Sequence, residues 1–184
     1  MRRFIALLLL LCCLGMLTGC LVDKEGAGDA GKTGTRVEQP KAKQEFLVYR
    51  AAADGSEKLL PEKFVIDDNG KTPMENALQY LVATKPGNAK LDDVVPIGTK
   101  VLGLRLENGI AYADFSKELA KKGQGSYQEM MLTYAIVNTL TEFSEVKKVQ
   151  ILIEGKKVLS LSGHMDLEDP LTRNTSLLDR SASK

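Results

Sequence analysis

The chain has 184 residues, with 25 Lys and Arg against 24 Asp and Glu, one His, three Cys and no Trp. This length fits one domain of ordinary size. Nucleic-acid binding needs a basic excess or stacking aromatic residues, and the net charge of +1 and 5% aromatic content supply neither. We therefore expect no nucleic-acid partner.

The N-terminus has the pattern of a bacterial export signal. Met1-Arg2-Arg3 is cationic, residues 4–16 are largely apolar, and Leu17-Thr18-Gly19-Cys20 resembles the lipobox of lipoprotein signal peptides. The apolar run is shorter than the about 20 residues that a transmembrane helix needs. The lipobox resemblance implies removal of residues 1–19, acylation of Cys20 with palmitate, and anchoring of the mature chain outside the cytoplasm of a bacterium. An ordinary signal peptide or membrane anchor with a coincidental cysteine is the alternative.

Processing leaves no free thiol, because Cys12 and Cys13 leave with the signal and the lipid occupies Cys20. We therefore expect neither a disulfide nor a cysteine nucleophile. Residues 20–44 are rich in Gly, Lys, Asp, Glu and Thr, which predicts a lipidated cysteine followed by a disordered linker.

The folded body is expected over residues 45–171, as one domain. Residues 172–184 show no hydrophobic periodicity, and we expect a flexible tail there.

The first half of the body predicts two strands and a helix. Residues 46–50 and 57–66 are the strands, and Pro61 makes the second an edge or bent strand. Thr72, which precedes a proline, is the expected N-cap of the helix, and Glu75 completes a capping box.

The second half predicts a hairpin, a helix and two further strands. Leu102, Leu104 and Leu106 alternate with other residues and indicate one apolar strand face, and Asn108-Gly109 predicts a tight turn into a strand over 110–115. The next segments are a helix from a capping box at Ser126 and Glu129 to about Thr141, and strands over 149–153 and 158–161.

The second helix is apolar around most of its girth, so it is either sandwiched in the core or leaves one face for a partner. The order β-β-α-β-β-α-β-β predicts an α+β fold, a small mixed or mostly antiparallel sheet with two helices on one face.

Candidate chemistry is sparse. His164 is the single imidazole, and a Gly-x-Ser-x-Gly nucleophile motif to serve it is absent from the sequence. We interpret His164 as a turn residue and keep a cell-wall hydrolase or amidase that uses it as the alternative. The acidic pairs Asp67-Asp68 and Asp92-Asp93 lack the spacing of a calcium loop.

A glycine-rich loop over 123–125 precedes the second helix, and Lys121 and Lys122 stand beside it. Such a helix start can hold an anion, but the P-loop pattern is absent and a flexible loop is the default. We expect no catalytic residue, no metal and no cofactor.

Several blocks of the body form a recognisable set. They are Val95–Thr99, Asn108–Ser116, Gly123–Gly125, Asn138–Phe143, Ile153–Gly155 and Leu161–Asp166. Together they resemble the GerMN domain of sporulation and germination proteins over about residues 46–171. The most specific block is Asn138-Thr139-Leu140-Thr141-Glu142-Phe143.

This resemblance implies a function without catalysis. GerMN domains are similar to ring-building motifs, small α+β modules that associate side by side in envelope complexes, and they occur in lipid-anchored proteins. We therefore expect a binding or assembly module, with the membrane, envelope proteins or like domains, or peptidoglycan as partners. In the block 138–143, Asn138, Thr139 and Thr141 either bond backbone groups at the helix end or contribute to a recognition edge.

Overall fold

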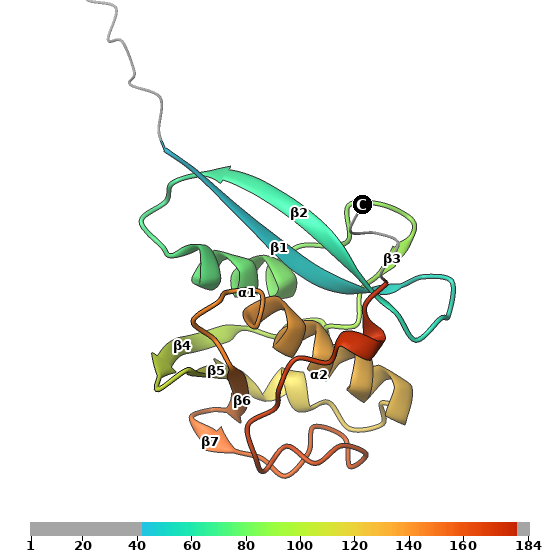
Figure 1. Cartoon of the computed structure of the whole chain (residues 1–184). Coiled ribbons are helices and arrows are strands. Elements are labelled where there is room, and N and C mark those ends of the chain that lie inside the picture. Colours follow the sequence, from blue (N-terminus) through green and yellow to red (C-terminus); the bar gives the residue numbers. More distant parts are fainter. Residues whose placement is uncertain (1–41, 180–184) are drawn as a thin grey trace, which may run out of the picture. The chain divides into compact units, whose positions relative to one another are not determined.

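The computed structural model describes residues 42–179, which form two sheets and two helices (Figure 1). The first sheet is antiparallel, with the order β2 (Leu59–Asp67), β1 (Lys43–Ala52), β3 (Leu91–Asp92). The second sheet has the order β4 (Val101–Glu107), β5 (Ile110–Phe115), β6 (Lys148–Ile153), β7 (Lys156–Lys157), and β5 and β6 are parallel. The helices are α1 (Pro73–Ala83) and α2 (Ser126–Leu140), with short 3₁₀ turns η1 (Lys117–Ala120) and η2 (Thr175–Leu177).

The predicted α+β class is confirmed, although the strands divide between two sheets where one was expected. Figure 1 shows both helices between the β1–β2 hairpin and the sheet that contains β4, β5 and β6. Helix α2 contacts both β1 and β6. Of the two alternatives for this apolar helix, the structure therefore shows the sandwiched one.

Burial on both sides of α2 follows from its composition. Ten of its residues are buried: Glu129, Met131, Leu132, Thr133, Ala135, Ile136, Val137, Asn138, Thr139 and Leu140. A helix that is apolar all round is stable only when both faces are covered, and here one sheet covers each face. Neither helix within residues 42–179 is long and apolar enough to cross a membrane.

Two local predictions are confirmed by the backbone. Thr72 caps α1, since its hydroxyl accepts the Glu75 N–H and the Glu75 carboxylate accepts the Thr72 N–H. Asn108 and Gly109 both have positive φ, as the tight turn between β4 and β5 requires.

Helix α2 begins at Ser126 as expected, but the expected capping box is wrong. Gly125 is the N-cap, and its N–H donates to the side chain of Gln128, so Ser126 and Glu129 form no capping box. The Glu129 side chain is fully buried and has distant partners, which local pattern could not reveal.

Strand β4 also differs from its expected pattern. The pairing with β5 shifts between Val101 and Gly103, which is a β-bulge at Leu102. Leu104 and Leu106 pair with the buried Ala113 and Ala111, whereas Leu102 is 52% exposed. The three leucines therefore do not share one face.

The C-terminal part contains two further corrections. Residues 158–161 form no strand, because the chain leaves β7 to meet Glu129. Residues 172–179, expected to be a flexible tail, pack on the body and include the buried Leu177. At the other end β1 begins at Lys43, two residues before the expected domain start.

One buried arginine joins the hairpin to α1. Arg50 is 1% exposed and pairs with Glu62 at 2.6 Å. Its guanidinium also donates to the carbonyl oxygens of Tyr80 and Thr84 at the end of α1. The Thr84 carbonyl belongs to the C-cap residue, whereas the Tyr80 carbonyl also accepts the Thr84 N–H and hydroxyl. The Glu62 carboxylate accepts the Gly87 N–H as well, so the pair fixes the chain that leaves the helix.

We expect substitution of Arg50 to lower the free energy of unfolding strongly. Arg50→Ala leaves the mostly buried Glu62 carboxylate without its cation, and we expect a loss of about 3–5 kcal/mol in the free energy of unfolding. Urea denaturation checks this. The matched control is Arg105→Ala, which removes an exposed pair with Glu107 and should cost about 1 kcal/mol at most. Equal losses for the two variants would contradict the assignment.

Candidate functional site

The block 138–143 lies at the C-terminal end of α2, against β1. Thr139 is fully buried, and its hydroxyl accepts the Tyr49 N–H at 2.9 Å. That N–H faces away from β2, so Thr139 supplies the acceptor that a neighbouring strand would otherwise give.

Asn138 holds the segment that follows β7. Its amide nitrogen donates to the Asn174 carbonyl at 3.0 Å, and its amide oxygen accepts the Asn174 N–H at 2.9 Å. The Asn138 side chain thus forms both hydrogen bonds that a strand residue would offer.

Glu142 lies at the centre of a group of polar side chains beside the end of α2. Arg173 donates to the Glu142 carboxylate at 2.6 Å and to the Tyr49 hydroxyl, which itself donates to Glu142. Burial and the Glu142 carboxylate raise the pKa of Tyr49 above its usual value, although Arg173 acts in the opposite direction. The hydroxyl therefore stays protonated and remains a donor.

The six residues of this block mostly have internal roles. Asn138, Thr139 and Leu140 are fully buried, and the Thr141 hydroxyl donates to the Val137 carbonyl. Phe143 packs against the core. The described contacts give this block a structural role, with the half-exposed Glu142 as its outermost polar group.

Glu129 anchors the loop over residues 160–164. One carboxylate oxygen accepts the Ser160 hydroxyl and the N–H groups of Leu161 and Ser162, and the other accepts the His164 N–H, all within 2.7–3.0 Å. Burial alone would raise the pKa of Glu129, but these hydrogen bonds outweigh it and hold the pKa below its usual value. The loop therefore folds around a buried anion.

His164 is exposed at the edge of this loop. Its Nε2 lies 3.2 Å from the Gln124 carbonyl oxygen. No hydroxyl or carboxylate side chain within residues 42–179 is hydrogen-bonded to the imidazole, whereas a general base in a hydrolase needs both a nucleophile and an orienting partner. The same contact ties the loop over 123–125 to residues 160–164.

The acidic pairs have local partners. The Asp68 carboxylate accepts the Gly70 N–H, and the Asp93 carboxylate accepts the Val95 N–H. A group of three or more metal-ligating side chains is not found among the described residues.

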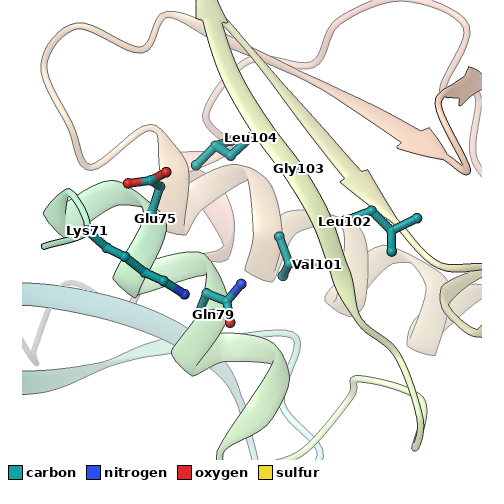
Figure 2. Close-up of a pocket in the computed structure, with 7 residues that line it drawn as sticks. All are labelled: Lys71, Glu75, Gln79, Val101, Leu102, Gly103 and Leu104. Carbon is teal, nitrogen blue, oxygen red and sulfur yellow. The ribbon is translucent and has the colours of Figure 1, made fainter. Parts of the chain in front are cut away.

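A shallow cavity of about 180 Å³ lies between α1 and β4. Figure 2 shows polar side chains of the α1 segment on one side of it and β4 on the other: Lys71, Glu75, Gln79, Val101, Leu102, Gly103 and Leu104. The Leu102 side chain points away from α1 in this view. In the described part of the chain β4 is an edge strand, so its outer backbone groups are not paired with another strand.

β4 and the loop before it carry three exposed apolar residues. Leu102 is 52% exposed and Leu106 38%, and Ile97, on the loop before β4, is fully exposed. The sequence showed these leucines but could not show their exposure, because the bulge that turns Leu102 outward depends on pairing with β5.

Comparison with known proteins identifies the domain. A sequence profile described as "Germane: Sporulation and spore germination" matches residues 47–159, more than half of the chain. The chain belongs to the Germane family. The predicted GerMN-type domain is thereby confirmed.

A sequence relative agrees with this Germane assignment. The spore germination protein GerM of Bacillus subtilis (strain 168) is 26% identical over 166 residues, which cover 81% of this chain and 45% of GerM. The chain thus spans about half the length of that relative.

Solved structures show the same fold. The first GerMN domain of the sporulation protein GerM from Bacillus subtilis has a TM-score of 0.59 at 24% identity, covering 71% of this chain and 98% of that domain. The tandem GerMN domains of the same protein give 0.60 at 23% identity, covering 71% of this chain and 46% of theirs. The Germane body of this chain therefore corresponds to one such domain.

Glu129→Gln should uncouple the 160–164 loop, because an amide nitrogen would face the His164 N–H. We expect a loss of roughly 2–3 kcal/mol in the free energy of unfolding at pH 7. Since the folded-state pKa lies below the usual Glu value of about 4.3, the carboxylate stabilises fully above that value and its contribution disappears as pH falls through the folded pKa.

Urea denaturation at several pH values measures this difference. The difference in the free energy of unfolding between the native chain and Glu129→Gln should become smaller as the solution is acidified below pH of about 4. Glu145→Gln, at an exposed glutamate, is the control and should stay within about 0.5 kcal/mol of the native chain. A gap that is constant or widens in acid would disprove the role of the ionised carboxylate.

Proposed function

We propose that this chain is a lipid-anchored binding module of the bacterial envelope, which acts without catalysis in sporulation or germination. The Germane profile supports the process, and the name of the relative GerM points the same way. The lipobox at residues 17–20 supports the anchor. Cys20 and the segment through residue 41 lie outside the described residues.

The edge of β4 is the surface that we assign to partner binding. A protein segment in extended conformation can add to an exposed sheet edge, where backbone hydrogen bonds give affinity and alternate side chains give specificity. A segment added at β4 would direct its side chains alternately to two sides. One set would enter the cavity beside α1, and the other set would lie over Leu102 on the far side of β4.

The chemistry of the cavity selects the occupant. Lys71, Glu75 and Gln79 present both charges and an amide, next to the apolar side chains of β4. A cavity of about 180 Å³ accepts one side chain of Val or Leu size, with polar neighbours. The partner in this proposal is therefore an extended protein segment with alternating apolar and polar residues, from an envelope protein.

The single observation that carries the proposal is the exposed apolar edge at Leu102. We expect a photo-crosslinking amino acid at Leu102, in living cells, to attach to an extended segment of an envelope protein. Val65 on β2 is the matched control, because it is a strand residue 53% exposed, against 52% for Leu102. Equal crosslinking at the two positions, or crosslinks from Leu102 to glycan alone, would contradict the assignment.

We expect Leu102→Glu to weaken binding of the partner that the crosslink identifies at least tenfold. The Glu carboxylate would have to lose its water when the partner strand is added. The free energy of unfolding should change by about 0.5 kcal/mol or less, since Leu102 is exposed. Co-purification of the identified partner with each variant measures the first effect, and urea denaturation the second.

The anchor has a direct test in radioactive palmitate. The native chain should incorporate the label and sediment with membranes, whereas Cys20→Ser should do neither. Cys12→Ser and Cys13→Ser are matched controls within the signal and should keep both properties. Label on the Cys20→Ser variant would refute the lipoprotein assignment.

A further inference from the structure

The segment from residue 171 to residue 179, called here the C-terminal strap, is bound by the body much as a peptide ligand would be. At its first residue Leu171 forms two backbone hydrogen bonds with Val149 of β6, each 2.8 Å long. Near its end Leu178 lies beside Leu59 of β2 in a parallel bridge. In Figure 1 the strap is the red segment that passes α2 and reaches the hairpin strands.

Between these ends the body binds both the backbone of the strap and one of its side chains. Asn138 forms its two hydrogen bonds with the backbone of Asn174, and the Lys58 ammonium donates to the Ser176 carbonyl at 2.8 Å. Arg173 is the strap side chain with the most polar contacts, which go to Asn138, Thr141, Tyr49 and Glu142.

Apolar packing of the strap is limited to three leucine side chains. Leu177 is its one buried side chain, and Leu171 and Leu178 are partly buried against the core. Two depressions of about 310 and 370 Å³ adjoin the strap, one on the Tyr49 side and one on the Lys58 side. Segments with few buried apolar contacts open at a lower free energy than the core that holds them. The strap can therefore leave its groove without unfolding of the two sheets.

We propose that this groove also accepts the C-terminal strap of a second copy, so that two chains exchange straps. The structure already demonstrates the fit of this occupant, since the contacts in an exchanged pair would be those seen within one chain. Exchange of an identical element is a low-cost route to a dimer for this reason. The hinge is the stretch over residues 168–170, which begins after the buried Leu167 and opens with two exposed residues. This exchange uses a surface separate from the β4 edge and does not rest on the proposed function.

A mixed disulfide tests the exchange. Val149→Cys goes into one tagged chain and Leu171→Cys into another, because this antiparallel pair lies within the Cα separation that a disulfide accepts. The unit from Gln39 to Lys184 is used, which has its own core and no cysteine. After incubation of the mixed chains, we expect disulfide dimers that carry both tags.

The matched control replaces Val149→Cys with Val65→Cys, at an exposed site where random collision is easier. Exchange predicts at least tenfold more mixed dimer with Val149→Cys than with this control. Equal amounts would overturn the proposal.

A second measurement applies where the cysteine variants fail to fold. A labelled peptide of residues 170–179 is titrated into the native unit, and exchange predicts saturable binding with one peptide per chain. The peptide with Arg173→Ala and Leu177→Asp should bind at least tenfold more weakly. Equal binding of the two peptides, or none, would overturn the proposal.

Discussion

The fold depends on covering both faces of α2. This helix has buried residues around its whole girth, so a single sheet would leave apolar side chains in water. The β1–β2 hairpin covers one face and the β4–β7 sheet the other. The Germane domain is therefore best understood as two small sheets that share one helix, and neither sheet has a complete core without it.

Polar side chains complete the structure where the helices end. Arg50 donates to the carbonyl of Thr84, the C-cap of α1, and Thr139 accepts an N–H of β1 at the end of α2. Glu129 near the start of α2 fixes the loop after β7. Each of these groups is buried, and each joins elements that apolar contacts alone would leave in several arrangements. Because their capacity for hydrogen bonding is used internally, partner binding is assigned to the more open β4 edge.

Much of the fold could be predicted from local sequence, and the errors share one cause. The turn at Asn108-Gly109 and the cap at Thr72 depend on residues within four positions, and both were predicted correctly. Glu129, the bulge at Leu102 and the strap after Leu171 depend on partners far away in the chain. Local pattern placed Glu129 in a capping box because the spacing fits, although its partners lie more than thirty residues later. The candidate docking edge was missed for the same reason, since exposure of Leu102 follows from tertiary pairing.

Native-state hydrogen exchange in increasing urea tests the shared helix most directly. If α2 unites the two sheets, the amides of β1 and those of β6 should exchange with the same free energy of opening, equal to that of α2. The N–H of Tyr49, bound to Thr139, is the reporter on the hairpin side, and that of Ile151 the reporter in the other sheet. A hairpin that opens at much lower urea, while β6 and α2 stay protected, would contradict the account.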